Sequence, residues 1–346
     1  MTEIEVNASQ RCTVHIGAGL LPETGRLLAG VVDPCRAMLV SDDTVFPLYG
    51  ARVRDSLAGA GFAVSEFVFP AGERSKNLAT FGQLLEALGA AGFARSDVVV
   101  ALGGGVVGDL AGFAGACYQR GIRVVQVPTT LLAATDSSVG GKTGVDLASG
   151  KNQAGAFHQP CLVVCDTQSF HTLDETNFAC GCAEAIKCGI LAAPDLFEIF
   201  ECGQARERID EIVAHCVKIK ADFVARDEFD TGDRRFLNLG HTFGHAVEAL
   251  SGYETPHGCA VAIGTALIAD ASVKAGALRP ETAARIRETL RRNGLPVACP
   301  YDAQALAAAA ASDKKISGGT ISVVLIRDVG DCFLQPVKLT ELGKLL

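Results

Sequence analysis

Several residue types and patterns are missing from this sequence of 346 residues. It has no tryptophan, two methionines and four tyrosines, and it contains no tract of clustered lysine or arginine. A net charge of -8 and a calculated isoelectric point near 5.4 argue against binding to nucleic acid or to an anionic membrane surface. No apolar run reaches the roughly 18 residues that a membrane span needs. We therefore expect a soluble protein whose partner is a small molecule.

Paired-cysteine motifs are absent as well. The 13 cysteines are an odd number, they form no CxxC pair, and the polar start MTEIEVNASQ lacks the apolar core of a secretory signal. These features favour free thiols in a reducing compartment, and we expect a cytoplasmic protein.

The pattern of apolar residues changes near the middle of the chain. Up to about residue 172, short β-branched runs such as RAMLVSD and SDVVVALGGG alternate with helical patterns, which is typical of strand–helix–strand units on a mostly parallel sheet. From Asn177 to Ala311 the spacing is nearly all helical, and TISVVLIR and DCFLQPV then resemble a hairpin. We predict an α/β domain over residues 1–172 and an α-helical domain over residues 173–346.

A glycine-rich turn follows one predicted strand. In VVVALGGGVVGD, the residues Gly103, Gly105 and Gly108 are in GxGxxG register at the start of a helix, where backbone N–H groups can approach a pyrophosphate. The turn departs from the usual dinucleotide fingerprint, because it follows roughly the fourth strand and because no acidic residue ends the next strand. Asp109 comes directly after the last glycine instead. A nucleotide site and a tight packing turn therefore both stay open.

Three of the seven histidines lie in one stretch, RRFLNLGHTFGHAVEALSGYETPHG. His241 and His245 are one helical turn apart and share a helix face, and His257 follows after a short connection. A zinc protease would need glutamate where Thr242 stands, so the sequence excludes that chemistry. The spacing favours a metal site over isolated core histidines.

Several charged residues stand in unusual surroundings. Glu184 and Lys187 are three residues apart among apolar neighbours, which favours a buried carboxylate near a metal and a cation beside it over a surface ion pair. Lys142 and Lys151 stand in the glycine-rich segments DSSVGGKTG and SGKNQAG. The alternative to a functional role for these lysines is that both segments are solvated turns. Further cations occur at Arg120, Lys220, Arg234, Lys314 and Lys315. Together such residues could line a cleft that attracts an anionic substrate.

In their order and spacing these motifs resemble those of the 3-dehydroquinate synthases, within the sugar phosphate cyclase superfamily. The matching stretches run from about Gly103 to Lys315 and include VPTTLLAATDSSVGGKTGVDLASGKNQAGAFHQP, AEAIKCGIL, LNLGHTFGHAVEA, HGCAVAIG and DKK. The resemblance implies a Rossmann-like nucleotide-binding α/β domain, an all-α metal-binding domain, bound NAD, a divalent metal (zinc or cobalt) and a homodimer. It also implies conversion of 3-deoxy-D-arabino-heptulosonate 7-phosphate to 3-dehydroquinate with release of phosphate.

The resemblance assigns roles to individual residues as well. It implies that the metal ligands are Glu184, His241 and His257. The residues it places near NAD are Asp42, Glu73, Lys76, Gly105, Val106, Val107, Gly108, Asp109, Thr129, Thr130, Lys142, Lys151, Phe170, His171 and Thr172. Those it places near substrate are Asp136, Lys142, Asn152, Lys187, Lys220, Arg234, Asn238, His245 and Lys315, with Arg120 coming from the other subunit.

Several positions depart from the usual pattern of that family. Cys259 stands where glutamate is usual, Cys180 where serine is usual and Cys188 where tyrosine is usual. These departures leave open an aminodehydroquinate synthase or another sugar phosphate cyclase. Remoter alternatives are a metal-dependent oxidoreductase of the glycerol dehydrogenase type and a catalytically inactive binding protein. The cysteines near the expected metal site are either buried packing residues or thiols that an oxidant can reach.

Overall fold

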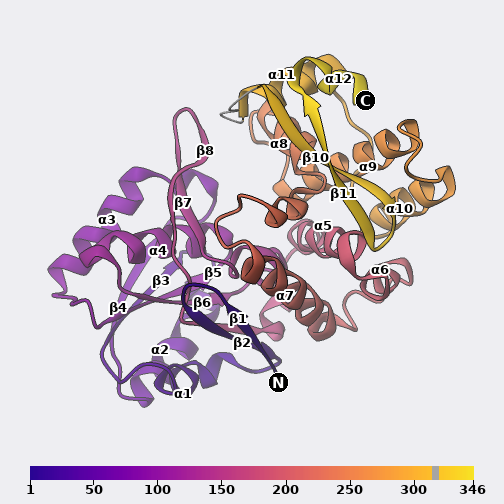
Figure 1. The fold of residues 1–346 in the computed structure, drawn as a ribbon. Coiled ribbons are helices and arrows are strands. Elements are labelled where there is room, and N and C mark those ends of the chain that lie inside the picture. The colour runs from indigo at the N-terminus through magenta and orange to yellow at the C-terminus, as the bar shows by residue number, and fades with distance from the viewer. Residues whose placement is uncertain (314–318) are drawn as a thin grey trace. The chain divides into compact units, whose positions relative to one another are not determined.

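The computed structural model describes residues 1–313 and 319–346, so Lys315 and its predicted substrate contact lie outside the described residues. The chain divides into two compact units (Figure 1). Unit 1 comprises Met1–Leu173 and Lys220–Phe229, and unit 2 comprises Asp174–Ile219 and Asp230–Leu346. The compact units thus differ from a single cut after residue 172, because Lys220–Phe229 packs with unit 1. The predicted domain bounds stay a prediction.

A seven-stranded sheet forms the centre of unit 1. Its strands are β1 (Thr2–Asn7), β2 (Arg11–Gly17), β3 (Arg36–Asp42), β4 (Ala63–Phe69), β5 (Val98–Gly103), β6 (Arg123–Pro128) and β9 (Leu162–Asp166). Their order is β1-β2-β9-β6-β5-β3-β4, and every neighbouring pair except β1 and β2 is parallel. The mostly parallel sheet expected from the sequence is confirmed.

Helices cover both faces of this sheet. They are α1 (Thr24–Ala29), α2 (Ala51–Gly59), α3 (Leu78–Ala90) and α4 (Gly105–Cys117). All six residues of the central strand β5 are buried, so both of its faces need a cover. One core cluster contains Leu28 of α1 and Leu57 of α2, and the other contains Leu84 of α3 and Leu110 of α4. Unit 1 is therefore a three-layer α/β fold.

The glycine-rich segments that carry Lys142 and Lys151 form a β-hairpin. Strand β7 (Lys142–Leu147) pairs antiparallel with β8 (Gly150–Phe157). A Cβ atom on Gly155 would lie 2.2 Å from the carbonyl oxygen of Thr143, so the two strands approach more closely than a residue with a side chain allows. Lys142 and Lys151 themselves thus lie on strands and not in turns.

Unit 2 is mainly helical. It contains α5 (Glu175–Ala192), α6 (Pro194–Glu201), the part of α7 (Ile209–Arg226) up to Ile219, α8 (His241–Leu250), α9 (His257–Lys274), α10 (Pro280–Arg292), α11 (Ala303–Asp313) and α12 (Leu342–Leu345). Strands β10 (Thr320–Asp328) and β11 (Asp331–Lys338) form the predicted hairpin. None of the helices in the described part of the chain is both long and apolar enough to span a membrane.

Glycines allow three helices of unit 2 to touch at the level of the main chain. A Cβ atom on Gly264 of α9 would lie 2.0 Å from the carbonyl oxygen of Gly240, the residue before α8. Gly240 itself has φ 77, in the left-handed region that favours glycine. A Cβ atom on Gly258 of α9 would lie 2.3 Å from the Cα atom of Cys180 on α5. Helix α9 is therefore in main-chain contact with both neighbours.

Candidate metal and nucleotide sites

Three helices of unit 2 bring a carboxylate and two imidazoles together. Glu184 lies on α5, while His241 and His257 are the first residues of α8 and α9. The Oε1 atom of Glu184 lies 3.5 Å from Nε2 of His241 and 3.3 Å from Nε2 of His257. One ligand atom from each of the three lies within 4.8 Å of the others. The structure thus brings the three predicted metal ligands into one cluster.

The spacing of these atoms suits zinc. Zinc–nitrogen and zinc–oxygen bonds of about 2.1 Å with tetrahedral angles place two ligand atoms about 3.4 Å apart. The two observed separations lie close to this value on either side. Two imidazoles and one carboxylate leave a fourth position for water or substrate, as in catalytic zinc sites, and imidazole also suits cobalt.

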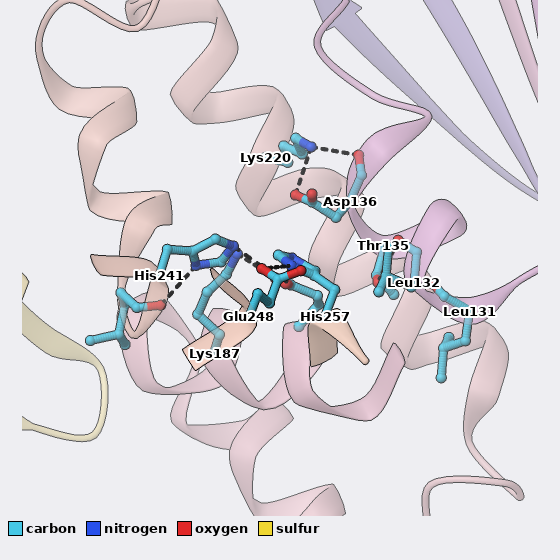
Figure 2. A network of polar contacts seen from close by, with 11 residues as sticks. Leu131, Leu132, Thr135, Asp136, Lys187, Lys220, His241, Glu248 and His257 are labelled. Atoms are coloured by element: carbon cyan, nitrogen blue, oxygen red, sulfur yellow. Dashed lines mark hydrogen bonds and ion pairs between the residues drawn. The ribbon is translucent and has the colours of Figure 1, made fainter. Parts of the chain in front are cut away.

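Each of the two imidazoles is oriented through its other ring nitrogen. Nδ1 of His241 lies 3.1 Å from the carbonyl oxygen of Leu239, and Nδ1 of His257 lies 3.0 Å from Oε2 of Glu248 (Figure 2). Because both oxygens accept hydrogen bonds, each Nδ1 carries a proton and each Nε2 is directed at Glu184. Outer partners of this kind accompany metal-ligating histidines almost always. The hydrogen-bond pattern therefore also fits a metal.

Burial and neighbouring charges set the protonation of this cluster. Burial lowers the pKa of His241 to about 3, so its ring is neutral. Burial also lowers the pKa of His257, but its hydrogen bonds with Glu184 and Glu248 outweigh that effect and raise the pKa to about 10. His257 is therefore a cation before a metal binds, and metal binding displaces a proton from its ring.

A buried lysine contacts the remaining oxygen of the carboxylate. Nζ of Lys187 lies 2.5 Å from Oε2 of Glu184, and the two side chains are 2% and 1% exposed. Burial alone would raise the pKa of Glu184, but the Lys187 ammonium holds it well below its usual value. The carboxylate therefore stays ionised, with one oxygen on the lysine and the other between the histidines.

Glu248 was not among the predicted site residues. It is 2% exposed and stands seven residues after His241, so two helical turns place it on the same face of α8 as His241 and His245. That spacing is the sequence signal that could have identified it. Its role is to position His257, because it contacts Nδ1 and leaves Nε2 for the metal.

Replacing Glu248 with alanine is expected to weaken zinc binding by about 10- to 100-fold, which is the usual effect of removing an outer partner. Glu248→Gln keeps an oxygen that accepts from Nδ1 and is expected to weaken binding less. Competition for zinc against a chromogenic chelator measures both effects. Glu254→Gln, at an exposed position in the following connection, serves as the control. Equal zinc affinity in Glu248→Ala and wild type would contradict the positioning role.

Three predicted substrate residues of unit 2 lie beside this cluster or just before it in the chain. The half-buried ring of His245 has its centroid 5.3 Å from that of His241 and 5.9 Å from that of His257. Arg234 and Asn238 lie on a short 3₁₀ helix, Asp233–Asn238, and two residues separate this helix from α8. Arg234 is 2% exposed, so it is not a solvated surface charge.

The predicted nucleotide residues of unit 1 follow the carboxyl ends of parallel strands. The neighbours of β3 are β4 on one side and β5 on the other, so the chain reverses its direction across the sheet between β3 and β5. Ligands of open parallel sheets bind in the crevice at such a reversal. Asp42 ends β3, Gly103 ends β5 and Thr129 follows β6. The topology therefore gathers these predicted residues at the expected edge.

The glycines in the turn after β5 have different functions. A Cβ atom on Gly103 would lie 2.5 Å from the side chain of Val107, and one on Gly108 would lie 2.6 Å from that of Gln126. The close approach of Val107 gives Gly103 a packing role, and the nucleotide role of Gly108 stays a prediction. Gly105 begins α4, where main-chain N–H groups can face an anion. Val107 is fully buried, which leaves only its main chain for a nucleotide, and Val106 is half-buried.

Lys76 is a buried cation that joins two residues from distant segments. Its Nζ lies 2.6 Å from Oδ2 of Asp109 and 2.6 Å from Oδ1 of Asn152. Burial lowers the pKa of Lys76, but Asp109 and Glu73 outweigh that effect and the pKa is raised. Glu73 also faces Lys151, with Oε1 and Nζ 3.7 Å apart. The structure thus brings together four predicted cofactor residues and Asn152, which was predicted to contact substrate.

Asp136 and Lys220, both predicted to contact substrate, form an ion pair within unit 1. Nζ of Lys220 lies 2.7 Å from Oδ1 of Asp136 and 2.5 Å from its main-chain oxygen (Figure 2). Lys142 is exposed at the start of β7, and Arg120 is exposed with φ 63. The role of Arg120 in a second subunit stays a prediction.

The remaining predicted nucleotide residues differ in whether their side chains already form hydrogen bonds within the protein and in how exposed they are. Oδ1 of Asp42 accepts from the N–H groups of Thr44 and Val45, and Oγ1 of Thr130 accepts from that of Ala133. The buried hydroxyl of Thr129, by contrast, has no hydrogen-bond partner among the described residues, which fits a ligand contact. Phe170 is 1% exposed, whereas His171 and Thr172 are exposed.

The fold and these sites define a class of protein. It has an α/β unit whose strand order reverses between β3 and β5, and a helical unit in which two imidazoles and a carboxylate lie together. Residues 66–180 match the family described as 3-dehydroquinate synthase N-terminal, and residues 181–316 match 3-dehydroquinate synthase C-terminal. The 3-dehydroquinate synthase of Paracoccus denitrificans (strain Pd 1222) is 43% identical over 334 residues, which cover 93% of this chain and 91% of that protein. The chain belongs to the 3-dehydroquinate synthase family.

Two solved structures share the fold over nearly the whole chain. A 2-epi-5-epi-valiolone synthase from Streptomyces hygroscopicus subsp. jinggangensis 5008, with NAD+ and Zn2+ bound, has a TM-score of 0.88 and 28% identity and covers 100% of this chain and 98% of its own. A 2-deoxy-scyllo-inosose synthase, complexed with carbaglucose-6-phosphate, NAD+ and Co2+, has a TM-score of 0.88 and 24% identity and covers 99% of both chains. The predicted fold class is confirmed.

Proposed function

We propose that this protein is a 3-dehydroquinate synthase, which converts 3-deoxy-D-arabino-heptulosonate 7-phosphate to 3-dehydroquinate and phosphate. The observation that carries the proposal is the cluster of Glu184, His241 and His257, at separations that suit zinc, in a chain that is 43% identical to such a synthase over 93% of its length. The proposed cofactors are NAD and zinc or cobalt. A homodimer in the cytoplasm is part of the same proposal.

The proposed cofactor sites follow from the two clusters. Glu184, His241 and His257 would hold the metal, and the crevice that Asp42, Gly105 and Thr129 border would hold NAD. When bound, the metal would polarise substrate oxygens as a Lewis acid, and NAD would accept and return a hydride. Lys187 keeps Glu184 ionised and in place through the contact at 2.5 Å.

Cations of this chain suit the two anionic groups of the sugar phosphate, its carboxylate and its phosphate. Lys220, Arg234 and Lys187 are each less than 7% exposed, although a chain of net charge -8 has ample acidic surface on which to place cations. Lys220 and Lys187 contact the carboxylates of Asp136 and Glu184, and buried positive charge of this kind supports an anionic substrate. In this proposal they bind and orient the substrate, while His245 holds or transfers a proton at its ring nitrogen.

The proposal is tested by incubating the purified protein with the heptulosonate phosphate, NAD+ and zinc chloride. We expect release of phosphate and formation of 3-dehydroquinate in equal amounts, without accumulation of NADH at its absorbance band. Steady accumulation of NADH without phosphate release would instead indicate a dehydrogenase. The amino analogue of the substrate is offered in parallel, because Cys180, Cys188 and Cys259 depart from the usual family pattern. Preference for that analogue would overturn the assignment in favour of an aminodehydroquinate synthase.

A further inference from the structure

Two cysteines from different helices face each other beside the metal cluster. Cys180 lies on α5 and Cys259 on the first turn of α9, and their sulfur atoms are 3.9 Å apart. Both are free thiols in the structure. Cys180 is 5% exposed, whereas Cys259 is half-buried, so a small reagent can reach the pair from the Cys259 side.

The main chains of α5 and α9 are already in contact at this point. Gly258 precedes Cys259, and a Cβ atom on it would lie 2.3 Å from the Cα atom of Cys180. A disulfide requires a sulfur–sulfur distance of about 2.05 Å, so the gap to be closed is about 1.9 Å. A change of χ1 between staggered rotamers moves a cysteine sulfur by about 3 Å. Side-chain rotation therefore closes the gap without separating or sliding the helices.

We propose that Cys180 and Cys259 form a reversible disulfide that joins α5 to α9. With a peroxide as oxidant, the sulfur of Cys180 attacks one peroxide oxygen, the O–O bond breaks, and a sulfenic acid and water result. The sulfur of Cys259 then displaces the hydroxyl group of the sulfenic acid, which leaves as a second water. Two thiols and one hydrogen peroxide thus give one disulfide and two waters, and a dithiol reductant reverses the reaction.

The geometry of the pair favours Cys180 as the sulfur that ionises, because the main-chain N–H groups of Gly258 and Cys259 donate to it. A hydrogen bond from the Cys259 thiol outweighs burial, and main-chain N–H groups at the start of α9 assist it, so that the pKa of Cys180 falls to about 7. A thiol with a pKa near ambient pH has a large thiolate fraction and is still nucleophilic.

Another neighbouring pair provides an internal comparison. Cys188 and Cys216 are 3% and 0% exposed, and burial holds the pKa of Cys216 well above its usual value. Neither member of this pair is half-buried as Cys259 is, so a peroxide has no open side from which to reach the two sulfurs, and they are expected to stay reduced.

A second consequence rests on the proposed metal site. Cys259 stands two residues after His257, and Cys180 stands four residues before Glu184. Because side-chain rotation closes the sulfur–sulfur gap, the disulfide fixes the first turn of α9 against α5 and leaves His257 opposite Glu184. Disulfide formation is therefore expected to leave zinc affinity close to that of the reduced protein.

The test treats the full-length, metal-loaded protein with dilute hydrogen peroxide and quenches it by alkylation. We expect the loss of two free thiols, a non-reduced peptide that links α5 to α9, and full recovery with dithiothreitol. Cys180→Ser and Cys259→Ser are expected to lack the linked peptide, while Cys202→Ser, at an exposed position after α6, is expected to behave as wild type. Absence of the linked peptide from oxidised wild type would overturn the proposal, and this readout does not depend on how the variants fold.

The two parts of the inference fail separately. A large loss of zinc affinity in protein that carries the linked peptide would disprove this expectation for the metal site and leave the disulfide standing. Lack of 3-dehydroquinate synthase activity would overturn the proposed function without altering the peptide result. Peroxide-linked Cys188 and Cys216 in place of the proposed pair would show that exposure does not control the reaction, and would overturn the proposal.

Discussion

His257→Ala is expected to lose metal and turnover together. The proposed site has three protein ligands, and zinc-binding free energies of about 10–16 kcal/mol shared by four ligands amount to about 3 kcal/mol each, or at least about 100-fold in affinity. The variant is also expected to release zinc on desalting. Elemental analysis after gel filtration, together with the phosphate-release assay, measures both.

Two other histidine variants separate the roles within and outside the cluster. His245→Ala is expected to keep its zinc and lose rate, because His245 adjoins the cluster but is placed on the substrate. His215→Ala, on α7, changes neither metal content nor rate in this assignment. Full zinc occupancy in His257→Ala would show that the metal, if bound, is held by other residues.

Lys187→Met is expected to destabilise the metal-free protein by about 3–5 kcal/mol, the usual effect of removing one partner from a buried ion pair. Glu184 is 1% exposed, so its carboxylate would lose the cation 2.5 Å away and keep only the His257 ring as a charged neighbour. Zinc is expected to restore part of the lost stability, because it supplies positive charge at the other carboxylate oxygen. Thermal unfolding with and without zinc measures both effects.

The charge of Lys187, rather than its size, is tested by two further variants. Lys218→Met makes the same substitution at an exposed position of α7 and is expected to be close to neutral. Adding Glu184→Gln to Lys187→Met removes the carboxylate that has lost its lysine partner. The double variant is therefore expected to recover part of the stability and to bind the metal more weakly. A loss in Lys187→Met that zinc leaves unchanged would argue against a metal next to Glu184.

The elements that sequence patterns predicted best are those with apolar periodicity of their own. The central strands are β-branched and buried on both faces, so β3, β5, β6 and β9 are readable from runs such as VVVALG. The hairpin β7–β8 is not, because Gly144 and Gly155 are there for close approach of the strands and suppress the alternation that marks a strand. The edge strand β1 was also missed, since its residues alternate with exposed glutamates.

The candidate site was predictable where its residues share one helix and was not where they meet across the chain. The helical spacing of His241 and His245 indicates that they share a site, and the apolar neighbours of Glu184 indicate that it is buried. The contact of Lys76 with Asp109 joins residues 33 positions apart, so only the folded sheet brings them together. Residue spacing also cannot show that Glu248 contacts His257 rather than solvent, because that depends on how α8 packs against α9.

The glycine contact between α8 and α9 limits how the distance between the two helices can vary. A Cβ atom on Gly264 would lie only 2.0 Å from the carbonyl oxygen of Gly240, so the two main chains are in contact, and no substitution removes main-chain atoms. Changes elsewhere in unit 2 can push these helices apart but cannot bring them closer. The spacing of His241 and His257 therefore has a fixed lower limit and an adjustable upper one, so its tolerance to sequence change is one-sided.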